Sequence, residues 1–257
     1  MNLFDTSIIH FLINNAESSP ALTSLMTVLV DNALLKGGVV VSILWYLWFR
    51  KSDEINVTRQ RVIISVISCI IAIFVGRLLA RVLPFRSRPL VSHTLEQFYH
   101  NKSMADSFDM ASSFPSDHAV MFFALATGIF LISKKLGLFA YLYVFFVICF
   151  PRVYLGLHYP TDILTGAVVG IITSLVLASP KLWRPVTERI LQISDKYTGA
   201  FYVLFFLISF EISTLFDSLR SIVHYLFGGL YESILGQRID KMAQIFMDAS
   251  SHFHHFF

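Results

Sequence analysis

The chain has 257 residues, of which 55% are hydrophobic and 14% are charged, and its formal net charge at pH 7 is +3. Soluble domains carry about a quarter charged residues, so this composition excludes an ordinary soluble protein and indicates an integral membrane protein. A net charge this small does not select nucleic acid or anionic lipid as a partner, and we expect no nucleic-acid partner.

The N-terminal segment, residues 1–20, predicts a short helix at the membrane interface. It lacks the basic region that begins a signal peptide, and it carries Asp5, His10 and Glu17. Its apolar positions fit a helix that lies along the bilayer surface. We therefore expect an interfacial segment and not a cleavable signal peptide.

Six apolar segments follow, and they predict six transmembrane helices. Helices are expected because lipid offers no water to satisfy the backbone, and the chain lacks the alternating pattern of barrel strands. The expected fold class is all-α, a six-transmembrane helix bundle, at roughly 20 apolar residues a span. The predicted spans are residues 22–49, 62–83, 118–132, 136–154, 163–178 and 200–215.

Basic residues in the short loops predict the orientation of the bundle. The first link, the third link and the segment after the fifth span carry Arg50, Lys51, Arg59, Arg61, Lys134, Lys135, Lys181, Arg184, Arg189 and Lys196. These loops share one face, which we assign to the cytoplasm. The N-terminus, residues 84–117, the turn 155–161 and the C-terminal segment then lie on the opposite side.

Neither the cysteines nor the C-terminal segment predicts a metal site. Cys69 and Cys149 lie in apolar runs and read as buried thiols, with no disulfide framework or zinc pattern. Residues 217–257 predict one or two amphipathic helices on the membrane or against the bundle. The ending "HFHHFF" holds three histidines. We interpret this ending as a frayed or lipid-dipping tail in preference to a metal site.

Three polar clusters fall at the outer ends of the second to fifth predicted spans. The first cluster is "RVLPFRSRP", residues 81–89; the second is "SSFPSDHA", residues 112–119; the third is "PRVYLGLHYPTD", residues 151–162. Cations that converge at span ends need an anion, and the neighbouring acids are too few to match them. A phosphate would satisfy the planar guanidinium groups. The candidate site residues are Arg81, Arg86, Arg88, Ser116, His118, Arg152, His158 and Asp162.

The two histidines supply groups for acid–base or nucleophilic chemistry near neutral pH. If "YPTD" begins the fifth span with Pro160 at its first position, Asp162 can accept the Nδ1–H of His158. The Nε2 lone pair would then face a substrate. His118 could protonate a leaving oxygen, and Ser116 marks a helix start that favours anions.

Each residue alone has a structural interpretation. An arginine at a span end commonly reaches for headgroups, Ser116 could cap a helix, and Asp162 could be a helix N-terminal charge. His158 beside Tyr-Pro could be a turn residue. The occurrence of all three clusters on one face favours a catalytic site over these separate interpretations.

At this point the chain resembles the type 2 phosphatidic acid phosphatase superfamily of membrane lipid phosphatases, which also includes vanadium haloperoxidases. The family pattern is Lys-x6-Arg-Pro, then Pro-Ser-Gly-His, then Ser-Arg-x5-His-x3-Asp. This chain has Arg81-x6-Arg88-Pro89, then Pro115-Ser116-Asp117-His118, then Pro151-Arg152-x5-His158-x3-Asp162. The resemblance covers roughly residues 20–180.

The resemblance implies a role for each matched residue. Arg81, Arg88 and Arg152 would grip the phosphoryl group with Ser116. His158 would attack phosphorus and form a phosphohistidine, Asp162 would orient His158, and His118 would protonate the leaving group. No metal and no other cofactor is implied, because cations and backbone dipoles stabilise the charge. The domains expected are thus an interfacial segment 1–20, a catalytic membrane core 21–180, a loop and sixth span 181–216, and the tail 217–257.

Three positions depart from the family pattern. Arg81 replaces a lysine and keeps the charge with a different geometry, Asp117 replaces a glycine, and Pro151 replaces a serine and removes one hydroxyl. Arg77 has no family role and is expected to pair with an acid or to reach headgroups.

The "FPSDH" motif and the outward-facing clusters resemble the bacterial undecaprenyl-diphosphatase branch. This implies a multi-pass protein of the bacterial plasma membrane that removes the terminal phosphate of undecaprenyl diphosphate on the periplasmic face. Phosphatidylglycerophosphate, phosphatidic acid and lipid A phosphates remain alternative substrates, and a lipid phosphotransferase remains an alternative enzyme. A non-catalytic transporter or scaffold for anionic lipids is the alternative of another class, and a haloperoxidase fits poorly because it needs no spans. The oligomeric state is left open.

Overall fold

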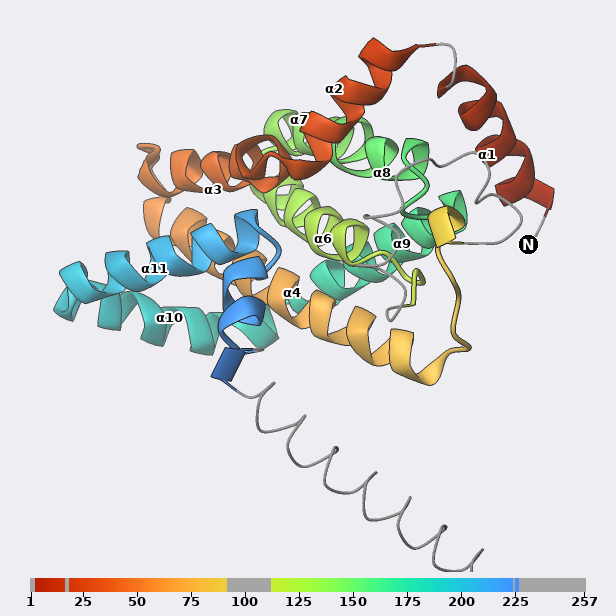
Figure 1. Cartoon of the computed structure of the whole chain (residues 1–257). Helices are drawn as coiled ribbons and strands as arrows, with labels where there is room; N and C mark the ends of the chain where they lie inside the picture. Colours follow the sequence, from red (N-terminus) through yellow and green to blue (C-terminus); the bar gives the residue numbers. More distant parts are fainter. Residues whose placement is uncertain (1–2, 17–18, 92–111, 224, 227–257) are drawn as a thin grey trace, which may run out of the picture. The chain divides into compact units, whose positions relative to one another are not determined.

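A computed structural model of the chain describes residues 3–16, 19–91, 112–223 and 225–226 (Figure 1). The chain forms two compact units, residues 1–215 and 216–257. The described part of the second unit holds a short helix, Asp217–Val223, with an ion pair between Asp217 and Arg220. The predicted amphipathic helices beyond residue 226 and the terminal histidines lie outside the described residues.

The described residues are helical and contain no strand, which confirms the all-α class for this part of the chain. The helices before the second cluster are α1 (Leu3–Ala16), α2 (Pro20–Asp31), the π-helix η1 (Leu34–Gly38), α3 (Val39–Phe49), α4 (Ile55–Val82) and the 3₁₀ turn η2 (Pro89–Val91). Those after it are α6 (Asp117–Ile132), α7 (Lys134–Tyr143), the π-helix η4 (Val144–Cys149), α8 (Phe150–Tyr154), α9 (Pro160–Leu177), α10 (Pro180–Lys196) and α11 (Thr198–Ser213).

Three helical segments among the described residues are long and apolar enough to cross a membrane: Ile55–Val82, Lys134–Tyr154 and Pro160–Leu177. The number rises to five if each of two interrupted pairs counts as one span, namely Pro20–Asp31 with Leu34–Phe49 and Thr198–Ser213 with Asp217–Val223. The protein is therefore multi-pass, and six spans remains a prediction.

Helix α6 explains part of this difference, because it is apolar but only 16 residues long. A helix of that length rises about 24 Å, less than the hydrocarbon thickness of about 30 Å. Every residue from 119 to 129 is buried, and α6 packs against α4, α7 and α9 (Figure 1). Because other helices surround α6, its length alone does not decide whether it counts as a span.

Small residues let α9 approach α6 closely. Gly166, Gly170 and Ser174 are spaced four residues apart along α9, and all three are buried. A Cβ atom on Gly170 would lie 2.2 Å from the carbonyl oxygen of Val120, and one on Gly166 would lie 2.8 Å from that of Ser116. Such small-x3-small spacing is typical of membrane helices whose backbones touch. The close contact brings the start of α9 beside the loop that precedes α6.

The segment after the fifth span, predicted as a loop, instead begins with helix α10. Pro180 occupies the first turn, where proline is favoured. Trp183, Thr187 and Ser194 form a buried stripe at helical spacing, and the Trp183 indole N–H donates to the carbonyl of Ala178 at 3.0 Å. The basic residues of this segment lie on the exposed face of an amphipathic helix, which is too polar to read as a span.

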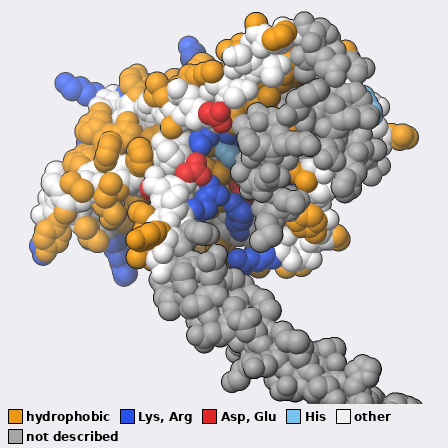
Figure 2. All heavy atoms as spheres, in the orientation of Figure 1, with side chains coloured by type: hydrophobic (Ala, Val, Ile, Leu, Met, Phe, Trp, Pro, Cys, Tyr) orange, Lys and Arg blue, Asp and Glu red, His pale blue; other side chains and the backbone are white. Residues whose placement is uncertain are grey.

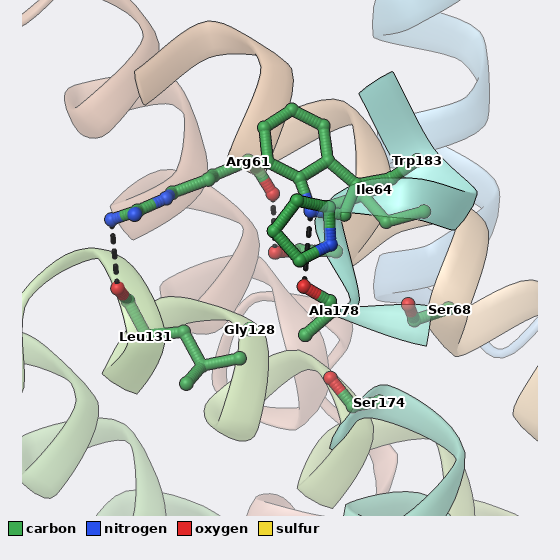
Figure 3. A pocket seen from close by; sticks show the side chains of 10 residues that line it. Arg61, Ile64, Ser68, Gly128, Leu131, Ser174, Ala178 and Trp183 are labelled. Atoms are coloured by element: carbon green, nitrogen blue, oxygen red, sulfur yellow. Dashed lines mark hydrogen bonds between the residues drawn. The ribbon is translucent and has the colours of Figure 1, made fainter. Parts of the chain in front are cut away.

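A cavity of about 130 Å³ lies where α10 meets the N-terminal half of α4 and the C-terminal ends of α6 and α9 (Figure 3). Ser68 and Ser174 point toward it, and Arg61 crosses its edge to donate to the carbonyl of Leu131 at 3.2 Å. The cavity occupies the ends of these helices opposite to those that carry the three clusters.

Candidate active site

The first and third clusters meet directly. The Arg88 guanidinium donates through Nη1 to the carbonyl of Leu157 at 2.8 Å, and the same atom lies 3.4 Å from Nε2 of His158. The backbone N–H of Leu90 donates to the carbonyl of Gly156 at 2.9 Å. Two segments nearly 70 residues apart in the sequence are thus joined beside the histidine.

The second cluster joins both of the others. The N–H of Ser116 donates to the carbonyl of Asp162 at 3.2 Å, and the N–H of Ser113 donates to that of Arg86 at 2.8 Å. The Ser113 carbonyl in turn lies 2.9 Å from Nδ1 of His158. The structure therefore brings the three predicted clusters together at one end of α4, α6 and α9.

His158 lies in a tight turn between α8 and α9 and is only 5% exposed. The amides of Leu157 and His158 both donate to the carbonyl of Arg152, and Gly156 has a φ of 69°, which favours glycine. Since a carbonyl can only accept, Nδ1 must carry the proton, and the neutral ring keeps its lone pair on Nε2, beside Arg88. Burial lowers the pKa of His158; the nearby Asp162 carboxylate opposes this shift, and the charges of Arg88 and Arg152 add to it.

Asp162 lies near His158, but its shortest contacts are with other groups. Its Oδ2 accepts the N–H of Tyr159 at 2.8 Å and lies 3.6 Å from Nδ1 of His158. Its Oδ1 accepts Nη1 of Arg86 at 2.6 Å. The direct hydrogen bond expected from the spacing is thus replaced by the Ser113 carbonyl at Nδ1, and Asp162 adds its charge from slightly farther away.

Three groups in this network were not singled out by the sequence patterns: Asp5, Ser113 and Thr161. Asp5 accepts Nη2 of Arg86 at 2.6 Å, and Thr161 accepts Nη1 of the same arginine at 2.8 Å. Arg86 also lies 3.9 Å above the ring of Tyr159. The one sequence signal for Asp5 was a carboxylate in a largely apolar N-terminal segment.

The remaining predicted residues lie around this centre with different exposure. Arg152 is 2% exposed, and its Nη1 donates to the carbonyl of Ile148 in its own helix segment. His118 is half-buried in the first turn of α6, with its ring 6.5 Å from that of Phe122. Arg81 is exposed in the last turn of α4, and no hydrogen bond or ion pair links it to another described residue. Arg81 is therefore the predicted phosphate-gripping residue that the described contacts do not join to the others.

Arg77 and Asp117 form an ion pair with 2.5 Å between Nη2 and Oδ2. The arginine without a family role thus pairs with the acid that replaces the family glycine. Their side chains are 46% and 18% exposed, so the pair lies at the rim of the site.

The site offers hydrogen-bond donors for an anion. The hydroxyls of Ser113 and Ser116 are buried and have no hydrogen-bond partner within the described ranges. Burial also lowers the pKa of Arg88, an effect that the charges of Asp117 and Asp162 oppose. Figure 2 shows basic, acidic and histidine side chains gathered near the centre of one face. Buried donors and cations of this kind fit a phosphate group.

The PAP2 superfamily sequence profile matches residues 78–184, which include all three clusters. The chain is 32% identical to the bacitracin transport permease protein BcrC of Bacillus licheniformis over 58% of this chain and 73% of that protein. It is 31% identical to YbjG of Escherichia coli K12, which carries the provisional name of an undecaprenyl-diphosphatase, over 68% of this chain and 81% of that protein. It is 27% identical to the undecaprenyl-diphosphatase BcrC of Bacillus subtilis 168 over 68% of this chain and 83% of that protein.

No solved structure matches the chain significantly. The profile, the relatives and the meeting of the three motifs agree with the resemblance seen in the sequence. The chain is therefore a multi-pass membrane lipid phosphatase that belongs to the PAP2 superfamily, in its bacterial undecaprenyl-diphosphatase-like branch.

Proposed function

We propose that the chain hydrolyses the terminal anhydride bond of undecaprenyl diphosphate, giving undecaprenyl phosphate and inorganic phosphate. Two relatives named as undecaprenyl-diphosphatases support this substrate. The observation that carries the proposal is the state of His158, whose Nδ1–H is bound by the Ser113 carbonyl while the Nε2 lone pair lies beside Arg88. This is the arrangement that a nucleophilic imidazole requires.

The reaction follows from these groups in two steps. Nε2 of His158 attacks the terminal phosphorus, the bond from phosphorus to the bridging oxygen breaks, and His118 gives its proton to that leaving oxygen. Water then attacks the phosphohistidine, passes a proton to His118, and releases phosphate while the phosphorus–nitrogen bond breaks. Asp162 supports the positive charge on the ring during the first step.

Cations and hydroxyls of the chain stabilise the transferring phosphoryl group in this scheme. Arg88, Arg152 and Arg81 bind its oxygens, and the Ser116 hydroxyl donates a further hydrogen bond. The protein supplies this charge stabilisation without a metal ion. We therefore expect EDTA to leave turnover intact, and vanadate to inhibit by imitating the phosphoryl group in its transition state.

The test is phosphate release by the purified protein from a panel of lipid phosphates. We expect undecaprenyl diphosphate to be preferred over phosphatidic acid, phosphatidylglycerophosphate and lipid A. His158→Ala should lose at least about 10³-fold in kcat, because the nucleophile is gone, and His118→Ala about 10²- to 10⁴-fold. Full turnover by a folded His158→Ala variant, or activity lost to EDTA and restored by added metal, contradicts the mechanism.

Two other activities, phosphotransfer and transport, would give results different from phosphate release. A phosphotransferase would place radiolabelled phosphate in a lipid acceptor and not in free phosphate. A relative carries the name of a bacitracin transport permease, which favours transport as the second candidate. A transporter would move its ligand across vesicles without releasing phosphate, and replacing His158 by alanine would leave this movement unchanged.

A further inference from the structure

Asp5 is a carboxylate with 0% exposure, and it comes from α1, far from the three motifs in the sequence. A buried carboxylate is costly unless charged or polar groups pair with it. Its hydrogen bonds with Arg86 and Thr161 tie it to the site. Oδ2 accepts Nη2 of Arg86 at 2.6 Å and the hydroxyl of Thr161 at 2.6 Å, and Oδ1 accepts the Thr161 backbone N–H at 3.0 Å.

The contact with Thr161 caps helix α9 from another part of the chain. The first N–H groups of a helix have no acceptor within the helix. In α9 the Tyr159 carbonyl accepts those of Asp162 and Ile163, and the N–H of Thr161 donates to Asp5 instead. Asp5 supplies the accepting oxygen, and its charge suits a helix N-terminus. The residue after Thr161 is Asp162, so the capped turn is the one that holds the carboxylate beside His158.

The contact with Arg86 balances the charge next to Asp162. Arg86 donates to both carboxylates, to Asp5 through Nη2 and to Asp162 through Nη1, at 2.6 Å each. With Asp5 removed, the whole guanidinium charge would act on Asp162. That carboxylate lies only 3.6 Å from Nδ1 of His158, so a small movement toward Arg86 would take it away from the imidazole.

We propose that Asp5 is a positioning residue for phosphoryl transfer, which acts through Arg86 and Thr161 on the geometry of Asp162 and His158. This inference rests on the proposed function. It assigns a part in the site to the N-terminal helix, which would otherwise be only a membrane-surface anchor. A positioning role affects the chemical step more than substrate binding, whereas an anchor would affect only folding.

The experiment measures kcat and KM for phosphate release, with melting temperature as the check on folding, in the full-length protein. Asp5→Asn keeps the shape and removes the charge, and we expect kcat to fall about tenfold or more while KM stays within about twofold. Asp31→Asn is the matched control, because Asp31 is an exposed carboxylate at the end of α2, and its kinetics should equal those of the wild type.

A double-mutant cycle tests whether Asp5 acts on catalysis through Arg86 or independently of it. If Asp5 acts through Arg86, the Asp5→Asn/Arg86→Gln variant loses clearly less activity than the product of the two single losses. Losses that multiply, or a folded Asp5→Asn variant with wild-type kcat, overturn the proposal. If Asp5→Asn does not fold, Thr161→Val removes one donor to Asp5 with both carboxylates kept; lower kcat at unchanged KM supports the proposal, and wild-type kcat overturns it.

The wild type and His158→Ala are assayed in parallel. Their activities show whether a negative result contradicts the role of Asp5 or the proposed phosphatase function. A wild type that releases phosphate and a silent His158→Ala variant uphold the function, so an unaffected Asp5→Asn variant then counts against Asp5 alone. A wild type that releases no phosphate from any lipid of the panel overturns the proposed function itself, together with the inference that rests on it.

Discussion

His158 combines a buried position with neighbours of both charges. Its ring lies between the Ser113 carbonyl, the carboxylate of Asp162 and the guanidinium of Arg88. Burial and the arginines favour the neutral ring, which is the nucleophilic form, and the carboxylate favours the charged form that develops when Nε2 is substituted. The residue is thus neutral in the resting protein, with a carboxylate in place for the charge that appears during the reaction.

The lowered pKa of His158 predicts the pH dependence of activity. The acid limb of kcat/KM should have its midpoint below about 6.5, the ordinary value for histidine, because protonation of Nε2 removes the nucleophile. The folded state also binds this proton less readily than the unfolded state, so the free energy of unfolding should fall as pH drops below about 6.5. A pH–rate profile from pH 4.5 to 8.5 is the measurement, and a midpoint above 6.5 contradicts the assignment.

The Arg77–Asp117 pair predicts an effect on substrate binding. Asp117 lies near Arg88, and Arg77 neutralises it at the rim of the site. Arg77→Gln should expose a phosphate substrate to an unbalanced carboxylate and raise KM about two- to fivefold, as expected for a half-exposed pair. The Arg77→Gln/Asp117→Asn double variant should restore KM at unchanged kcat, and a double variant as impaired as the single one excludes this explanation.

At the scale of the helices, the site depends on how closely α9 approaches α6. The carbonyl oxygen of Ser116, just before α6, lies only 2.8 Å from where a Cβ on Gly166 would be, and the Ser116 N–H donates to the carbonyl of Asp162. The same contact that packs the two helices therefore also holds the second cluster against the third. Packing and catalysis share this interface, so changes in small residues of α9 should affect both.

Gly170→Ala tests this contact. Alanine is ordinarily favoured over glycine in a helix, but the new Cβ would lie 2.2 Å from the Val120 carbonyl oxygen and force the backbones apart. We expect destabilisation of about 1–3 kcal/mol, seen as a lower melting temperature in detergent. Gly199→Ala is the matched control, since nothing lies within 4 Å of its Cβ position in α11, and it should be neutral or stabilising.

For the whole molecule, the charges divide between the two ends of the bundle. The basic links and helix α10 lie at one end of α4, α6 and α9, and the candidate site lies at the other. With the basic end in the cytoplasm, the site would face the periplasm or the cell exterior. A substrate whose diphosphate is exposed on that side would approach the site from there.

Cysteine labelling tests this orientation. Ser87 and Ser52 are exposed at opposite ends of α4, and the native Cys69 and Cys149 are buried, so background labelling should be low. A membrane-impermeant maleimide should label Ser87→Cys in intact cells and Ser52→Cys only after the membrane is opened. The reverse pattern would place the site in the cytoplasm.

The sequence by itself determined the helical class, the superfamily and the three motifs, because composition and short-range spacing carry that information. Arg88, His158 and Asp162 could be identified from the sequence because each belongs to a motif contained in one short continuous segment. Their mutual contacts, the bond from Nδ1 to the Ser113 carbonyl and the pairing of Arg77 with Asp117 were decided only by tertiary structure. So was Asp5, since a carboxylate 81 residues from Arg86 acquires a partner only when the helices pack. Hydrogen bonds act over about 3 Å in space, and no local pattern specifies which distant groups the packing will bring that close.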